Sequence, residues 1–240
     1  DGWLNLIDRI ELAPGSFRVG SGAGNDLVLG KGPADLGVLT LDATGQARFV
    51  PVGAETGAAP LVFLPVGEAP PRLIIGGLLL EMTEVEAQYA LRVRDLDPGS
   101  RQGFAGLRYF PVNPDWRIRA DWITLDAPQS VAIGLVNGVT STVTLTHKAL
   151  FFHAGTRVEL LPTHLKSGQP MFVIRDLTSR DATYGASRFL YGEDVGDGQI
   201  TLDFNKAFNP PCAFTDLAIC PLPPRENILP FRIEAGELRP

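Results

Sequence analysis

The chain is poor in cysteine and histidine, and it has no long apolar run. Of its 240 residues, two are cysteine and three are histidine. A structural zinc site takes four ligands, so the two cysteines alone do not make one. The longest apolar stretch, residues 73–80, is interrupted by Gly76 and Gly77 and is shorter than the ~18 residues of a membrane-spanning helix. We therefore expect no zinc finger and no transmembrane segment.

Positive charge is also scarce. The chain has 21 Lys and Arg against 27 Asp and Glu, a net charge of −6. Such a surface repels a phosphate backbone, and no stripe of Lys and Arg compensates for it. We expect no nucleic-acid partner; an unidentified small molecule or protein is the partner expected. Because residue 1 is Asp rather than Met, a preceding signal peptide and the compartment, cytoplasmic or exported, stay open.

Glycine and proline, by contrast, are plentiful. The 26 Gly and 20 Pro stand singly between short apolar runs, which is the pattern of many short strands joined by tight turns. Residues 116–122 alternate apolar and charged side chains, as a strand with one buried face does. The sequence therefore predicts an all-β protein. A β-sandwich is expected over residues 1–100 and a second antiparallel β-sandwich or barrel over residues 101–240, with a turn at 97–100 near the boundary.

The strands expected in the second half are short. They are residues 116–122, 131–136, 141–145, 149–153, 157–161, 171–175, 188–191, 199–203 and 231–234. Residues 81–90 are assigned to strand and loop, because they lack a sustained helical period. Residues 205–230 hold six prolines and both cysteines. Since proline fixes φ and cannot donate to a sheet, this segment is expected to be irregular but stiff.

Polar side chains gather around that stiff segment. A rigid polar loop at the end of a sheet is a common place for a binding site. The same side chains could instead satisfy the backbone groups of the loop itself. The candidate binding residues are Tyr184, Arg188, Asp203, Asn205, Asn209, Asn227, Glu234 and Glu237.

Three functions remain open at this site. The first is a non-catalytic binding or scaffold protein that holds a small ligand or partner at the C-terminal loop. The second is a hydrolase or isomerase in which Asp203 or a glutamate works with Tyr184 and Arg188. The third is a purely structural β protein.

The two cysteines, Cys212 and Cys220, leave their own alternatives open. They could form a disulfide, stay as free thiols or supply half of a metal site, and the unknown compartment decides between the first two. Among the histidines, His147 and His153 would lie about 20 Å apart along an extended strand, too far to share an ion. No nucleophile elbow or phosphate-binding loop is present. We expect no metal and no cofactor.

Several motifs of the second half resemble the domain-of-unknown-function family 1684. They are TYGASRFL (residues 183–190), DFNKAFNPPCAF (203–214), CPLPP (220–224), EN (226–227) and EAGE (234–237). Ser187 stands where this family is expected to have glycine. The opening GWL (2–4), with Gly15 and Gly20, is also similar to the start of the family, so the resemblance extends over the whole chain. It implies no activity, because the family is uncharacterised.

The first half resembles a forkhead-associated domain. The segments FRVGS (17–21) and NDLVL (25–29) are similar to the second and third strands of that β-sandwich. That family binds phosphothreonine through an arginine after the glycine and a downstream Ser-x-x-His. Here Ser21 follows Gly20, and GVL (37–39) stands in place of Ser-x-x-His. The resemblance implies a β-sandwich that does not bind phosphothreonine peptides.

Overall fold

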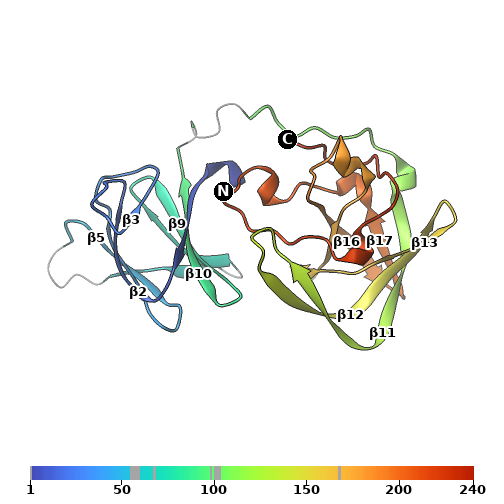
Figure 1. Cartoon of the computed structure of the whole chain (residues 1–240), viewed down its shortest axis with the longest axis horizontal. Helices are drawn as coiled ribbons and strands as arrows, with labels where there is room; N and C mark the ends of the chain where they lie inside the picture. Colours follow the sequence, from blue (N-terminus) through green and yellow to red (C-terminus); the bar gives the residue numbers. More distant parts are fainter. Residues whose placement is uncertain (1, 55–59, 67–68, 98, 100–103, 167–168) are drawn as a thin grey trace. The chain divides into compact units, whose positions relative to one another are not determined.

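The computed structural model describes residues 2–54, 60–66, 69–97, 99, 104–166 and 169–240. The chain divides into two compact units, Asp1–Phe104 and Ala105–Pro240, and each is described by itself. The described residues form strands and short 3-10 turns without an α-helix (Figure 1), which confirms the predicted all-β class. Within these ranges, no helix has the length and apolarity that a membrane crossing requires. The turn predicted at 97–100 lies partly outside the described residues.

Unit 1 consists of ten strands over its described residues, after one 3-10 turn. The elements are η1 (Trp3–Asn5), β1 (Leu6–Leu12), β2 (Gly15–Gly20), β3 (Leu27–Val28), β4 (Gly37–Leu41), β5 (Ala47–Pro51), β6 (Leu61–Val62), β7 (Leu64–Val66), β8 (Ala69–Ile75), β9 (Leu78–Val85) and β10 (Gln88–Asp95). Two five-stranded sheets result, in the orders β1-β10-β9-β8-β7 and β3-β2-β4-β5-β6. Residues 81–90 are strand and turn as predicted.

The two sheets of unit 1 share one apolar core. Leu39 of β4 and Phe49 of β5 are buried on one side, and Leu80 of β9 and Leu91 of β10 are buried on the other. The residues of β4 alternate strictly between buried and exposed, as expected when only one face of a strand meets a core. Unit 1 is therefore a β-sandwich.

Unit 2 is built on one larger sheet and a long irregular segment, residues 204–240, which we call the C-terminal segment. Its elements are η3 (Pro114–Trp116), β11 (Arg117–Gly134), β12 (Thr140–His153), β13 (Thr156–Leu160), β14 (His164–Lys166), β15 (Gln169–Ile174), η4 (Leu177–Arg180), β16 (Arg188–Gly196), β17 (Gln199–Asp203), η5 (Phe204–Lys206), η6 (Pro211–Ala213) and η7 (Arg225–Asn227). The sheet is antiparallel throughout its named pairs, in the order β13-β12-β11-β17-β16-β15-β14.

The first two strands of this sheet are longer than the sequence pattern indicates. Residues 116–122 and 131–136, expected as two strands, are joined in β11, and residues 141–145 and 149–153 are joined in β12. The ladder between β11 and β12 shifts register between Thr124 and Gln129. A bulge of this kind breaks the alternation of side chains while the strand continues. The sequence pattern therefore shows an interruption where the structure has one bent strand.

The core of unit 2 lies against the inner face of this sheet. Ala120, Ala149, Phe172 and Leu202 are buried there, and the predicted alternation of residues 116–122 is confirmed, with Arg117, Arg119 and Asp121 outside the core. Buried side chains of the C-terminal segment pack on the same core. They are Phe204, Ala207, Leu229, Ile233 and Ala235.

The strand predicted at residues 231–234 is wrong. These residues are irregular, although Ile233 is fully buried. The carbonyl of Phe231 accepts a bond from the N–H of Leu177, and the N–H of Ile233 donates to the Asp176 carboxylate. Because these backbone groups bond to a 3-10 turn and a side chain, the segment forms no ladder with a neighbouring strand. The irregular backbone predicted for residues 205–230 is confirmed, since the segment holds only short 3-10 turns and isolated bridges; its stiffness stays a prediction.

Candidate functional site

Arg188, one of the predicted site residues, lies in the interior of unit 2. Its side chain is 2% exposed and its Nη2 lies 2.7 Å from Oδ2 of Asp176, which is equally buried. The guanidinium also donates to the carbonyl oxygens of Ile233 and Ala235. Burial lowers the pKa of Arg188, and the charge of Asp176 opposes that effect. The bonds to the two carbonyls tie β16 to the C-terminal segment, and the ion pair ties β16 to the start of η4.

The carboxylate of Asp176 is fully used by its surroundings. Its second oxygen accepts bonds from the N–H and the hydroxyl of Thr178, at 2.9 and 2.7 Å, and from the N–H of Ile233, at 3.1 Å. The bond from the N–H of Thr178 caps the 3-10 turn η4. A ligand that bound to Arg188 would have to break this network, so the contacts support a structural role for Arg188.

Asn227 holds two distant strands to the C-terminal segment. Its side chain is completely buried. The amide nitrogen donates to the carbonyls of Leu161, at 2.8 Å, and Val173, at 2.9 Å, while the amide oxygen accepts from the N–H of Leu161 at 2.8 Å. Three of the four hydrogen bonds available to an asparagine are therefore made with backbone groups.

Asn209 and Glu237 form a second buried group. Glu237 accepts from the N–H of Asn209 at 2.8 Å and from the hydroxyl of Tyr109 at 3.0 Å. The amide nitrogen of Asn209 donates to the carbonyl of Leu238 at 2.7 Å. The charge of Glu237 also reaches the Arg188 guanidinium, so Arg188, Asn209 and Glu237 are brought into one region of unit 2.

The remaining predicted residues bond to other parts of the chain. Asn205 makes a reciprocal pair of 2.9 Å bonds with the backbone of Asn113, and Asp203 accepts from the N–H of Asn205. Tyr184 donates to the carbonyl of Cys212 at 2.9 Å, whereas Glu234 is exposed and pairs with Arg232. The predicted residues thus fall into several separate groups, each bonded to its own backbone neighbours.

Cys212 and Cys220 are not joined by a disulfide, so each keeps its thiol. The N–H of Cys212 points at the sulfur of Cys220 at 3.2 Å. A hydrogen bond from the Cys220 thiol lowers the pKa of the Cys212 thiol to about 7, and the Tyr184 hydroxyl acts in the same direction. The three side chains form a compact group on the C-terminal segment.

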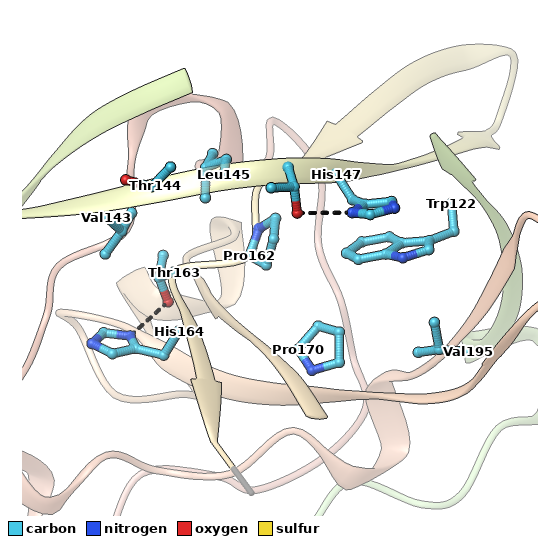
Figure 2. A pocket seen from close by; sticks show the side chains of 11 residues that line it. Trp122, Val143, Thr144, Leu145, His147, Pro162, Thr163, His164, Pro170 and Val195 are labelled. Atoms are coloured by element: carbon cyan, nitrogen blue, oxygen red, sulfur yellow. Dashed lines mark hydrogen bonds between the residues drawn. The ribbon is translucent and has the colours of Figure 1, made fainter. Parts of the chain in front are cut away.

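A separate opening in unit 2 is a cavity of about 540 Å³ that we call the β12–β14 cavity. Strands β12 and β14 stand near opposite edges of the sheet order, yet both contribute to its wall. The sheet must therefore be curled enough to bring β12 and β14 to one cavity, whose lining side chains are drawn in Figure 2. The lining residues are Trp122, Val143, Thr144, Leu145, Thr146, His147, Pro162, Thr163, His164, Pro170 and Val195.

Strand parity explains which side chains of β12 face this cavity. Leu145 and the core residues Ala149 and Phe151 are buried on the same face of the strand. Val143 and His147 have the same parity and are half-buried; Val143 lies beyond the buried run, and His147 lies within it, between Leu145 and Ala149. Trp122 on β11 stands directly opposite Ala149 in the ladder. The β12–β14 cavity is therefore an open continuation of the core.

The polar side chains of the cavity wall are two imidazoles and the hydroxyls of three threonines, Thr144, Thr146 and Thr163. Figure 2 shows the His147 ring lying parallel to the Trp122 ring, with centroids 5.1 Å apart and planes inclined by 6°. Nδ1 of His147 lies 2.9 Å from the Thr146 hydroxyl, and Nδ1 of His164 lies 3.2 Å from the Thr163 hydroxyl. The described lining contains no Asp, Glu, Lys or Arg.

Sequence reasoning did not identify this cavity. From the sequence, His147 and His153 are considered only as metal ligands, and the structure places them against different tryptophans, Trp122 and Trp116. The available signal was a histidine at the inward parity of β12, in line with Val143 and Leu145. Only the curl of the sheet brings that position to Pro162 and His164.

The comparisons with known proteins concern mainly unit 2. A family model described as "Protein of unknown function (DUF1684)" matches residues 102–238. An uncharacterised protein of Haloarcula marismortui, solved by NMR in solution, is 32% identical, with 59% of this chain and 80% of that chain covered and a TM-score of 0.47. No curated protein matches the chain. The family match starts at residue 102, so it supports the predicted membership for the second half and does not include the opening motif.

Proposed function

Since this chain belongs to the DUF1684 family of proteins of unknown function, we propose a function from the geometry of its own residues. Unit 2 binds a small, uncharged and largely apolar molecule in the β12–β14 cavity, and it does so without catalysis. The observation that carries this proposal is the 540 Å³ cavity, whose described lining has an aromatic and aliphatic surface, two imidazoles and no charged side chain.

The size and composition of the cavity suit a small ligand. Pockets that bind small molecules usually enclose about 300–1,000 Å³ and combine apolar walls with a few polar groups. Burial of an apolar ligand surface contributes roughly 25 cal/mol per Å². Pro162 and Pro170 are both buried, and their rings restrict the backbone before a ligand arrives. Such preorganisation lowers the entropy lost on binding.

His147 gives the ligand one defined polar contact. The Thr146 hydroxyl occupies Nδ1 of this ring, which leaves Nε2 as the ring atom that can bond to a ligand. Stacking on Trp122 fixes the plane of the imidazole. A ligand with a carbonyl or hydroxyl group at one end of an apolar body would satisfy both the apolar walls and this nitrogen.

Binding is proposed ahead of the hydrolase or isomerase hypothesis for a physical reason. That hypothesis requires Arg188 to work at the substrate beside the acid or base, whereas its side chain is 2% exposed and bonded to Asp176 and two carbonyls. The C-terminal loop stays a second hypothesis for the binding site. Its side chains, however, already bond to the protein, while the β12–β14 cavity offers surface that a ligand can cover.

A neutral apolar dye tests the proposal. Nile red added to the full chain should bind with saturable fluorescence and a stoichiometry of one, because the dye is uncharged and fits a cavity of this size. Val143→Phe should weaken binding by tenfold or more, since Val143 lines the cavity and the larger ring fills it. The measurement is a fluorescence titration, with native mass spectrometry of the purified protein to detect a retained ligand.

Val136→Phe is the matched control. It adds the same bulk at a position of unit 2 that is 40% exposed and does not belong to the cavity lining. This variant should bind the dye like the unmodified chain. Equal loss in both variants, or equal binding in both, would show that the dye adheres to another apolar surface and would contradict the proposal.

We also propose that residues 1–100 and 101–240 are separate domains and that the first is a forkhead-associated-like sandwich without phosphothreonine recognition. Two features support this. Asn25 and Ser21 bond to the backbone carbonyls of Ala34 and Gly32, at 2.7 and 2.8 Å, so the loop that would receive a phosphate is closed by its own contacts. Ser21 also stands where an arginine would be required.

A further inference from the structure

The backbone carbonyls of Cys212 and Cys220 are each hydrogen-bonded to another part of unit 2. The carbonyl of Cys212 accepts the hydroxyl of Tyr184 at 2.9 Å. The carbonyl of Cys220 accepts the N–H of Val136 at 3.0 Å, and the next bond, from Leu222 to Gly134, is 2.7 Å long. Each cysteine is therefore anchored separately to the body of unit 2.

Proline limits the backbone on both sides of the pair. Pro210 and Pro211 precede Cys212, and Pro221 follows Cys220. Fixed φ angles at these positions reduce the number of conformations that the segment can adopt. The 3.2 Å bond from the Cys212 N–H to the Cys220 sulfur shows how near the two residues lie. The two cysteines are therefore in contact before any covalent bond joins their sulfurs.

The two thiols differ in exposure. Cys220 is 1% exposed, whereas Cys212 is only half-buried. A thiol that reacts with a dissolved oxidant must be reachable, and its thiolate is the nucleophile. The neighbouring thiol lowers the pKa of Cys212 to about 7, so much of it is ionised near neutral pH. Reactive cysteines of this kind often stand beside a second cysteine that resolves the first oxidation product.

We propose that Cys212 and Cys220 form a redox-active dithiol that a hydroperoxide converts reversibly into a disulfide, with Cys212 as the attacking residue and Cys220 as the resolving residue. The pair is independent of the ligand proposed for the β12–β14 cavity. It constitutes a modification site on the C-terminal segment.

The reaction balances in two steps. The Cys212 thiolate attacks one oxygen of the hydroperoxide; the O–O bond breaks, the alcohol leaves with a proton, and Cys212 becomes a sulfenic acid. The Cys220 thiol then attacks that sulfur; the S–S bond forms, the S–O bond breaks and water leaves with the Cys220 proton. In sum, two thiols and one hydroperoxide give a disulfide, an alcohol and water. An external dithiol restores both thiols by exchange.

Hydrogen peroxide applied to the reduced full chain tests this assignment. After treatment, iodoacetamide should label neither cysteine under denaturing conditions, and the intact mass should fall by the mass of two hydrogen atoms. Dithiothreitol should restore both labels. Labelling of both cysteines after peroxide treatment and before dithiothreitol is added would overturn the proposal. Irreversible addition of oxygen without a disulfide would overturn it as well.

Single variants assign the two roles. In Cys220→Ser the sulfenic acid of Cys212 should persist and be captured by dimedone. In Cys212→Ser the buried Cys220 should stay reduced under the same treatment. Faster oxidation of Cys220 than of Cys212 would show that the attacking and resolving roles are exchanged and would contradict the proposal. Because the unmodified chain gives the disulfide result by itself, the test does not depend on the folding of either variant.

Tyr184 is proposed as a positioning residue for Cys212. Tyr184→Phe removes the hydroxyl that bonds the Cys212 carbonyl and helps to lower the thiol pKa. The pH midpoint of iodoacetamide labelling of the native protein should then rise from about 7 towards the ~8.5 of an ordinary cysteine. Tyr191→Phe, a half-buried tyrosine stacked on Phe208, is the control and should leave the midpoint unchanged. Equal midpoints in both variants would remove the role of Tyr184.

Discussion

At the scale of single residues, the most constrained group in unit 2 is the buried ion pair of Arg188 and Asp176. Both side chains are almost fully removed from solvent. Two charges in such a place cost desolvation energy that their attraction offsets only when the remaining donors and acceptors are also bonded. Here the carbonyls of Ile233 and Ala235 and the turn at Thr178 complete the network.

Loss of the carboxylate should therefore destabilise unit 2 strongly. Asp176→Asn leaves the guanidinium buried without a counter-charge, and we expect the free energy of unfolding to fall by about 3–5 kcal/mol. Urea denaturation followed by tryptophan fluorescence measures the change. The control is Asp181→Asn, which removes the partner of the exposed Arg232 and should change stability little. An equally small effect of both substitutions would contradict the structural role of the pair.

The residue scale also shows how far the sequence could lead at the C-terminal loop. The sequence indicated Arg188, Asn209 and Asn227 either as ligand-binding residues or as hydrogen-bond partners of the loop itself. Whether they bind a ligand or the loop itself depends on distances in space. For Asn227, three bonds to the backbone of Leu161 and Val173 join residues more than fifty positions away, and no local pattern reveals such partners.

At the scale of elements, one glycine allows the end of the chain to pack closely against Ala207. Gly236 has a φ of +80°, and a Cβ at this position would lie 2.5 Å from the carbonyl oxygen of Ala207. The close approach allows the N–H of Glu237 to bond to that same oxygen at 2.8 Å. Both the backbone conformation and the contact therefore favour glycine.

Gly236→Ala should lower the stability of unit 2 by about 2–4 kcal/mol, because the methyl group strains φ and also displaces a backbone oxygen. Gly155→Ala is the matched control. Gly155 has a φ of +78°, but nothing lies within 4 Å of its Cβ position, so only the strain of about 1 kcal/mol should remain. Thermal unfolding of both variants gives the comparison. Equal losses would mean that the close packing of Gly236 contributes nothing.

Strands were predictable where alternation is unbroken and unpredictable where it is interrupted. Residues 116–122 and 199–203 lie in β11 and β17 as expected. The continuity of β11 and β12 was missed because the bulge near Thr124 hides it. Residues 231–234 have the composition of a strand, yet their backbone groups find partners in a turn and a carboxylate. Element type is thus decided by the available partners as well as by the pattern.

At the scale of the whole molecule, each unit has its own apolar core. The buried residues around Leu39 and Leu91 belong to unit 1, and those around Phe172 and Leu202 belong to unit 2. A segment of about 100 residues with its own core can fold alone. This arrangement supports the proposal that residues 1–100 and 101–240 are separate domains.

Residues 105–240 expressed alone should therefore fold and keep both proposed activities. We expect a cooperative unfolding transition, Nile red affinity within about twofold of the full chain, and peroxide-dependent formation of the Cys212–Cys220 disulfide. Circular dichroism and the two assays described above provide the readouts. An unfolded fragment would contradict the independence of the domains, whereas a folded fragment without dye binding would contradict only the site proposed for the β12–β14 cavity.

The sequence by itself determined the all-β class, the irregular backbone of the segment after residue 204 and the family membership of the second half. These follow from local properties: alternation along a strand, the fixed φ of proline and short motifs. Only the tertiary structure decided that Arg188 and Asn227 bond to the protein itself, that Cys212 and Cys220 lie in contact without a disulfide, and that a cavity opens between β12 and β14. The physical reason is that hydrogen bonds, burial and sheet curl depend on residues brought together from distant parts of the chain.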